Sequence, residues 1–408
     1  MVIDMNNTQQ FDLCIVGGGL VGSALAIACN QLGLSIALVE QKTLSILQPD
    51  NPLDMRHIAL SHGSKVIFEN LNVWQHLKPF AHAIENIHVS DQGMWGFTRL
   101  SAKEQQMPAL GYVIPYHDLQ TVLSQQLQAC DNVTYFTNTN VLASGLVDHD
   151  WQLTLENAQQ INITAKLLIA ADGVNSHLRK MNNIDITEKD YQQTAIVTTV
   201  KVTHPTNDVA YERFTPEGII ALLPAGDDLM ALVWTVDNGK VQDFLDADDQ
   251  VFLQQIQQAF GYRVGKFSAL GSRQSFPLKL AVAQEQIKNR LLFLGSAVHN
   301  LHPIAAQGFN LALRDIAGLY DVFKNHLTDI GSEIALKDYV TQRKQDQQRT
   351  VRFTDGLVLL FSNRFLPIVK LRNTLMVLLD IYKPGKAWLG RYGAGRLGKL
   401  PSLAKGEQ

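Results

Sequence analysis

Short apolar runs alternate with amphipathic segments along much of the chain, and this pattern predicts alternating strands and helices. Residues 11–16 and 35–39 are short, apolar and β-prone, whereas residues 23–32 between them are rich in Ala, Leu and Ile, as in a buried helix. Two later apolar runs, 165–171 and 290–294, each lead into a turn and a predicted helix. This order predicts an α/β fold with a doubly wound, Rossmann-like parallel sheet.

The pattern changes in the middle of the chain and again at its end. Residues 194–203, 209–214, 218–223 and 229–236 have the character of strands joined by turns rich in Pro, Gly and Asp, which predicts a mostly antiparallel sheet. Apolar residues occupy most positions of 366–382, which predicts a C-terminal helix.

These changes predict a discontinuous α/β domain with an inserted antiparallel β-sheet domain and a C-terminal helical segment. The length of 408 residues suits two closely joined domains better than one compact core. The expected ranges are 1–75, 100–180 and 271–345 for the α/β domain, 76–99 and 181–270 for the inserted domain, and 346–408 for the helical, basic segment.

A glycine-rich turn directly follows the first predicted strand. Gly17, Gly19 and Gly22 have the spacing of a dinucleotide-binding turn, which also contains Leu20 and Val21. In such a turn the first glycine permits the bend, the second lets the backbone approach a pyrophosphate, and the third lets helix and strand pack closely. The helix N-terminus then offers free N–H groups to the phosphates.

The second predicted strand ends at Glu40, which is followed by Gln41. An acidic side chain at this position can accept hydrogen bonds from the ribose hydroxyls of an adenosine. We therefore expect both residues at a dinucleotide cofactor. The fingerprint by itself does not distinguish FAD from NAD.

Two later motifs, together with this turn, resemble the flavoprotein aromatic hydroxylases. They are Asp172-Gly173 in the middle of the chain and Gly295 with its following Pro and Gln-Gly-x-Asn loop. Within that family, residues 302–311 are similar to the UbiH subgroup of the UbiH/UbiF/VisC ubiquinone hydroxylases. Further segments that resemble this group are 54–61, 89–91, 212–215, 260–266 and 314–315. The resemblance spans nearly the whole chain.

The resemblance implies FAD as the cofactor and NADPH or NADH as a transient co-substrate. It places the loop from Pro303 to Asn310 against the isoalloxazine ring, with Pro303 and Gln307 at the substrate and flavin pocket. It also implies that Arg56 reaches the flavin or pyrophosphate, and that Asp172 lies near the pyrophosphate. The implied cofactor-binding residues are Gly17, Gly19, Leu20, Val21, Gly22, Glu40, Gln41, Arg56, Asp172, Gly295, Ser296, Ala306, Gly308, Phe309 and Asn310.

Two positions depart from the sequence pattern of the wider family. Ser296 stands where the family has Asp, and Ala306 stands where relatives usually have Gly, so a methyl group restricts the backbone there.

His299 and His302 form an H-x-x-H pair, but no Cys or carboxylate cluster completes a metal site, and we predict none. We assign no catalytic acid or base. The alternative for Asp172 is an acid that only holds a turn.

The resemblance implies a flavin C4a-hydroperoxide, formed with O2, that hydroxylates a prenylated phenol. The implied substrate is 2-polyprenyl-6-methoxyphenol and the implied product is the 1,4-benzoquinol, as in ubiquinone biosynthesis. Three alternatives remain open at this point. They are a sister hydroxylase for another ring position or phenol, a flavin reductase that inserts no oxygen, and a non-catalytic FAD-binding assembly subunit.

Charge and composition restrict the partners. The net charge of −3 argues against nucleic acid, and three widely spaced cysteines fit a reducing compartment without disulfides. No signal peptide and no apolar run of membrane-spanning length are visible, so a cytoplasmic protein is expected.

From Asn363 onward the chain has nine Lys or Arg against two acids. This basic, apolar tail suits peripheral contact with the inner face of the cytoplasmic membrane, and the alternative is a helix packed on the FAD domain. The resemblance also implies contact with other ubiquinone-biosynthesis proteins.

Overall fold

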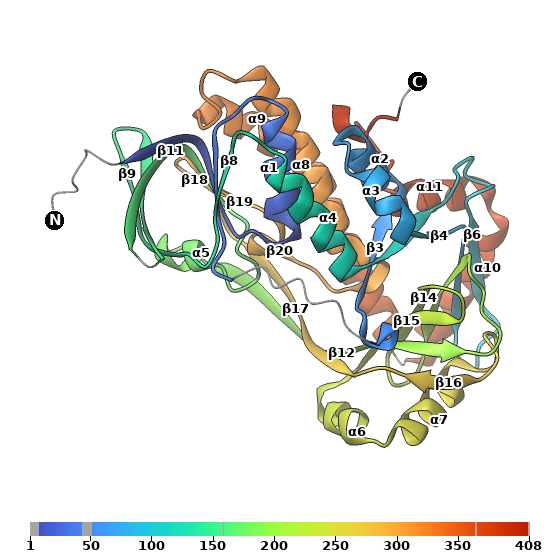
Figure 1. Ribbon diagram of the computed structural model, residues 1–408. Helices are drawn as coiled ribbons and strands as arrows, with labels where there is room; N and C mark the ends of the chain where they lie inside the picture. The colour runs from blue at the N-terminus through green and yellow to red at the C-terminus, as the bar shows by residue number, and fades with distance from the viewer. Residues whose placement is uncertain (1–7, 43–50, 158, 364, 407–408) are drawn as a thin grey trace.

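The computed structural model describes residues 8–42, 51–157, 159–363 and 365–406, which form a parallel sheet, an antiparallel sheet and a small sheet between them (Figure 1). The strands of the parallel sheet and its extensions are β1 (Gln9–Val16), β2 (Ile36–Val39), β8 (Val133–Phe136), β9 (Asn140–Val147), β10 (Asp150–Glu156), β11 (Gln160–Ala170), β18 (Ile287–Lys288) and β19 (Leu291–Phe293). Strands β19, β11, β1, β2 and β8 lie side by side in parallel. The predicted α/β class is confirmed.

Alternating residues of β1 face two different layers. Leu13 and Ile15 pack against helices, whereas Cys14 packs on the opposite face with Trp151 and Leu153 of β10. The helices on the first face are α1 (Leu20–Asn30), α4 (Tyr116–Gln128) and α8 (Gln307–Asn325). The second face is covered by the short helix α5 (His177–Met181), which follows the turn after β11 as predicted, and by the antiparallel strands β9 and β10, which the sequence pattern did not predict.

The antiparallel sheet lies at the other end of the molecule (Figure 1). Its strands are β5 (Asn86–Asp91), β6 (Phe97–Ser101), β12 (Ile186–Val202), β13 (Val209–Phe214), β14 (Ile219–Pro224), β15 (Leu229–Asp237), β16 (Phe267–Leu270), β17 (Gln274–Ala283) and β20 (His299–Asn300). The four predicted strands are found as β12 to β15. Strand β17 falls in the range expected for the α/β domain, but it pairs with β12 along its whole length.

The small sheet joins the two large ones. It contains β3 (His57–Ser61), β4 (His82–Ile84) and β7 (Gly111–Pro115), and the adjoining helices are α2 (His62–Asn70) and α3 (Trp74–Leu77). On the antiparallel sheet, Leu222 and Trp234 belong to the core that packs against α6 (Val241–Asp246) and α7 (Asp249–Phe260).

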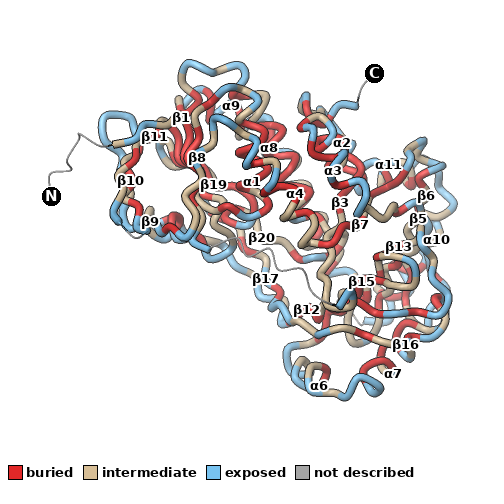
Figure 2. Tube along the Cα trace, in the orientation of Figure 1, coloured by how far each residue is buried: buried red, intermediate tan, exposed pale blue. Residues whose placement is uncertain are grey.

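The C-terminal segment consists of α9 (Glu333–Ser362), α10 (Leu366–Ile381) and α11 (Lys383–Gly393). Helix α9 is attached to α8 by a buried ion pair in which Arg343 Nε lies 2.7 Å from Asp315 Oδ1. Helix α10 is attached to the antiparallel sheet by Arg372, which donates to the Asp91 carboxylate at 2.7 Å. The inner side of α10 is therefore buried and its outer side exposed (Figure 2).

The described residues contain no helix that is both long enough and apolar enough to cross a membrane.

Candidate functional site

In the glycine-rich turn between β1 and α1, Gly17 and Gly22 lie too close to other backbone atoms to carry a side chain, whereas Gly19 borders open space. A Cβ on Gly17 (φ +108°) would lie 2.4 Å from the carbonyl oxygen of Ala171, and a Cβ on Gly22 would lie 1.8 Å from that of Gly17. A Cβ on Gly19 would meet nothing within 4 Å. The space beside Gly19 lies at the N-terminus of α1, where a pyrophosphate would find free N–H groups.

Glu40 lies at the carboxyl end of β2, beside this turn. Its carboxylate accepts hydrogen bonds from the backbone N–H of Gly18 at 2.7 Å and of Lys42 at 2.9 Å. A carboxylate has about four acceptor positions, so capacity remains for ribose hydroxyls. Gln41 is exposed next to it. The residues at this edge thus fit an adenosine dinucleotide.

Asp172 follows β11 and faces the start of α5. Its Oδ2 accepts from the backbone N–H of His177 at 2.7 Å and of Leu178 at 3.2 Å. Its Oδ1 is buried and has no partner within the described ranges. The structure therefore shows the turn-holding role that the sequence left as an alternative, while one carboxylate oxygen stays free for a ligand.

The turn after β19 reaches the same edge of the parallel sheet. Gly295 has φ +64°, and a Cβ on it would lie 3.2 Å from Cγ2 of Val21 in the first turn of α1. Leu20 is buried beneath that turn, and Ser296 is exposed beside Gly295. The three predicted nucleotide motifs are thus brought together.

Arg56 lies at the entrance to β3 and stacks on aromatic rings. Its guanidinium carbon is 4.5 Å from the ring centre of Tyr116 and 5.7 Å from that of Phe276. It is absent from the walls of the two cavities described below. Its contact with the cofactor stays a prediction.

The loop that leads into α8 contains two successive alanines in the left-handed region. Ala305 has φ +57° and Ala306 has φ +49°, a conformation that L-residues other than Asn and Asp rarely adopt. The Ala306 N–H donates to the carbonyl of Pro303 at 2.9 Å, and Gln307 Nε2 donates to the carbonyl of Ala305 at 3.1 Å. A Cβ on Gly308 would meet nothing within 4 Å. The loop is therefore strained, tightly bonded and open on one side.

The side chain of Asn310 holds this loop against β3. Its Oδ1 accepts from the Ser61 N–H at 2.8 Å and the Ser64 hydroxyl at 2.7 Å, while its Nδ2 donates to the carbonyls of Ala59 and Ala306. An amide side chain has two donor hydrogens and two acceptor lone pairs, so all four are in use. Asn310 was predicted to bind the cofactor, but its side chain is committed to the loop, and only its backbone is left for a ligand.

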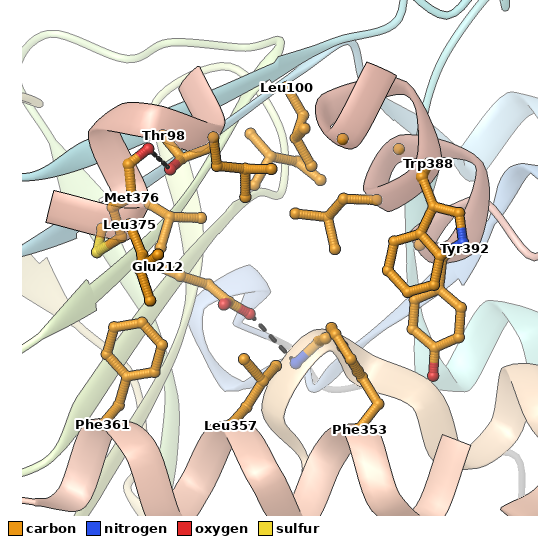
Figure 3. A pocket seen from close by; sticks show the side chains of 18 of the residues that line it. Thr98, Leu100, Glu212, Phe353, Leu357, Phe361, Leu375, Met376, Trp388 and Tyr392 are labelled. Atoms are coloured by element: carbon orange, nitrogen blue, oxygen red, sulfur yellow. Dashed lines mark hydrogen bonds between the residues drawn. The ribbon is translucent and has the colours of Figure 1, made fainter. Parts of the chain in front are cut away.

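Two cavities meet at this loop. One, of about 400 Å³, lies between residues 301–310, β3 and the strands β14 and β15, and its wall includes Pro303, Gly308 and Phe309. The other, of about 510 Å³, is lined mainly by apolar side chains of β5, β6, α9, α10 and α11 (Figure 3). We call them the loop cavity and the apolar cavity. Glu212 and Ala305 line both.

His302 lies in the wall of the loop cavity and is buried. Its Nδ1 accepts from the Ile304 N–H at 3.1 Å, so the ring proton is on Nε2, which has no partner among the described residues. Burial lowers its pKa to about 4, so the ring is neutral. Over the described ranges, no three His, Cys, Asp or Glu side chains come together as metal ligands.

The sequence did not reveal Glu212 or the helical wall of the apolar cavity. Phe353 and Leu357 of α9 and Trp388 of α11 come from a segment that was expected only to be helical and basic. Glu212 belonged to a resembling segment, but a charged residue on a β-strand usually faces solvent. Only the tertiary structure shows that its side chain lines the two cavities.

Comparisons with known proteins agree with this arrangement. A family model described as FAD binding domain matches residues 10–354. The ubiquinone hydroxylase UbiL of Rhodospirillum rubrum is 30% identical and the match covers 95% of this chain and 90% of that protein. A 3-demethoxyubiquinol 3-hydroxylase of Escherichia coli is also 30% identical, over 90% of this chain and 93% of its own. The solved structure of p-nitrophenol 4-monooxygenase from Pseudomonas putida has the same fold, with a TM-score of 0.78 at 13% identity, covering 96% of this chain and all of that one.

The open space at Gly19 generates a testable prediction. We expect Gly19→Ala to leave the thermal stability of the FAD-free protein unchanged, because the added methyl meets no protein atom, but to raise the Kd for FAD roughly tenfold or more, a cost of about 1.4 kcal/mol. Gly22→Ala should lower the stability itself, because its Cβ would collide with Gly17. Flavin fluorescence titration and thermal melting measure the two effects.

Gly239→Ala is the matched control, since a Cβ there also meets open space but lies far from the turn. Unchanged FAD affinity in Gly19→Ala would show that the cofactor does not approach this turn.

Proposed function

Because the chain belongs to the FAD binding domain family and is an FAD-dependent aromatic hydroxylase, we propose that its substrate is a prenylated phenol of ubiquinone biosynthesis. The specific reaction is 2-polyprenyl-6-methoxyphenol to 2-polyprenyl-6-methoxy-1,4-benzoquinol, with NADPH or NADH and O2, as in the UbiH subgroup. The resemblance of residues 302–311 to that subgroup supports this choice, and the two ubiquinone-pathway relatives support the pathway.

The observation that carries the proposal is the apolar cavity beside the strained loop. Its wall includes Leu100, Phe353, Leu357 and Met376, and the figure shows these side chains turned toward the same hollow (Figure 3). A phenol without a tail would not need this space. A prenyl tail would bury apolar surface there at about 25 cal/mol per Å².

The residues of the chain have three tasks in this reaction. FAD, when bound, would supply the redox chemistry, in which two electrons come from NADPH or NADH and one oxygen atom of O2 goes to an aromatic ring. The N-terminus of α8, at Gln307, places its positive dipole end at the loop, where it favours negative charge. The loop positions the ring, and the apolar walls of the cavity exclude water from the reacting atoms.

Filling the apolar cavity should discriminate between substrates with and without a tail. We expect purified wild-type protein to hydroxylate 2-prenyl-6-methoxyphenols, and Leu357→Trp to lower kcat/KM for long-tailed substrates about tenfold or more, since overpacking costs about 1–3 kcal/mol. The tail-free phenol 2-methoxyphenol should react equally well with both proteins. Equal losses for both substrates would contradict the assignment of this cavity to the tail.

We also propose that the outer face of α10 rests on an anionic membrane surface, from which a lipid-soluble substrate would enter. Its exposed apolar residues, with those of the adjoining segments, are Phe365, Leu366, Leu371, Leu375, Leu378, Ile381, Tyr382 and Trp388. Lys370, Lys383 and Arg391 are exposed beside them. Leu375 and Trp388 also line the apolar cavity, which links this face to the cavity. Positive charge next to an apolar face suits the anionic inner leaflet.

Two of the basic residues of the C-terminal segment form ion pairs within the protein instead of facing a membrane. Arg372 is paired with Asp91, and Lys386 lies 3.2 Å from Glu104. Arg364 lies outside the described residues. The membrane contact therefore rests on the exposed lysines and arginine named above.

Vesicle binding tests this surface. The double variant Leu371→Ser/Leu378→Ser should bind vesicles containing phosphatidylglycerol about tenfold more weakly than wild type, because burial of a Leu side chain contributes roughly 1.5–3 kcal/mol. Leu327→Ser/Ile334→Ser, two exposed apolar residues at the α8–α9 connection, is the control and should bind like wild type. Co-sedimentation measures all three. Binding of the α10 double variant at the wild-type level would exclude this face.

A further inference from the structure

Glu212 occupies the junction of the two cavities. It lies on β13, where successive side chains face opposite sides of the sheet. Ala210, Glu212 and Phe214 line the cavities, whereas Arg213 faces the other way and donates to the carbonyl of Ala259. Figure 3 shows the Glu212 carboxylate directed into the apolar cavity.

The Glu212 carboxylate has little inside the protein to neutralise it. Its partner within the described ranges is the N–H of Ala305, which donates to Oε1 at 3.2 Å, and no described cation forms an ion pair with it. Arg372, which also lines the apolar cavity, is already paired with Asp91. A carboxylate in apolar surroundings is costly unless a ligand or proton compensates it. Burial accordingly raises the pKa of Glu212, and the hydrogen bond from Ala305 opposes that rise.

We infer that Glu212 is a catalytic residue that accepts the hydrogen bond, and then the proton, of the phenolic hydroxyl of the substrate. This inference rests on the proposed function and adds the residue that orients the ring. With the hydroxyl at the junction, a tail ortho to it enters the apolar cavity. The para carbon then points into the loop cavity, beside Pro303 and Ala306.

Proton transfer to Glu212 makes the ring more reactive toward the incoming oxygen atom. The O–H bond of the phenol breaks, its proton binds the Glu212 carboxylate, and the oxygen electron pair moves into the ring. The para carbon forms a C–O bond to one atom of O2 as the O–O bond breaks. The other atom leaves as water with the two electrons and the hydride hydrogen of NADPH or NADH and one proton from solvent. The para carbon then loses its hydrogen as a proton, which balances the hydrogen of the new hydroxyl group, and Glu212 returns its proton to the original ring oxygen. A raised pKa makes the carboxylate a stronger base for this purpose.

The other titratable groups that line the two cavities are His57, His302, Tyr392 and Arg372. Burial lowers the pKa values of His57 and His302 in the loop cavity to about 4, and it raises that of Tyr392 on α11. Arg372 is already paired with Asp91. A protonated Glu212 cannot accept the phenolic proton. The hydroxylation rate should therefore fall as the pH drops through the raised pKa of Glu212.

The test compares Glu212→Gln with Glu217→Gln. The amide oxygen of Gln can still accept from Ala305, so the loop should fold, and FAD content verifies this. Glu217 lies on the same hairpin but lines neither cavity. The probe is 2-geranyl-6-methoxyphenol. We expect Glu212→Gln to lower its kcat/KM about 10²-fold, to abolish the acid limb of the pH profile and to divert NADPH oxidation to H2O2. Glu212→Asp should restore the acid limb, and Glu217→Gln should match wild type.

A Glu212→Gln enzyme that keeps the wild-type rate and acid limb would overturn the inference while leaving the proposed function intact. If wild-type protein fails to hydroxylate the probe, the proposed function fails. Binding of 2-methoxyphenol, followed by the flavin absorption spectrum, then decides the inference separately. Wild-type affinity should fall on acidification and that of Glu212→Gln should not, and identical pH dependence in the two proteins would overturn it.

Discussion

The loop that precedes α8 is the constraint on which the site depends. Two successive left-handed alanines cost about 1–3 kcal/mol each, so this shape persists only because its surroundings fix it. Glu212 bonds the amide of Ala305, and Asn310 bonds the carbonyl of Ala306 and the backbone of β3. These contacts tie the antiparallel sheet, the small sheet and α8 together. They also set the boundary between the loop cavity and the apolar cavity.

Much of the fold follows from local sequence features. The glycine spacing, the flanking apolar strands and Glu40 predict the nucleotide edge, since the positive φ of Gly17 and the close approach of Gly22 to the Gly17 carbonyl are both local requirements. Strands β13 to β15 follow from period-two patterning and turn residues. The C-terminal helix from Leu366 was also predicted correctly.

What the sequence could not predict depends on long-range packing. No local sequence feature indicates that β9 and β10 cover one face of the parallel sheet. None indicates that the side chain of Asn310 hydrogen-bonds to β3. The expected unit of strand, turn and helix that begins with β19 also contains β20, which leaves the parallel sheet and pairs with Ala281 and Val282 of β17 in the antiparallel sheet. Glu212 shows the same limit, because its burial arises from helices that follow it by more than a hundred residues.

We propose that this flavin enzyme oxidises the para position of a prenylated methoxyphenol. A sister hydroxylase would use the same fold with the ring turned differently. The most direct test is mass spectrometry of the quinone precursors that accumulate in cells lacking the protein. The account predicts accumulation of 2-polyprenyl-6-methoxyphenol, with ubiquinone restored by the intact gene. Unchanged ubiquinone, or accumulation of a precursor already oxygenated at that carbon, would contradict it.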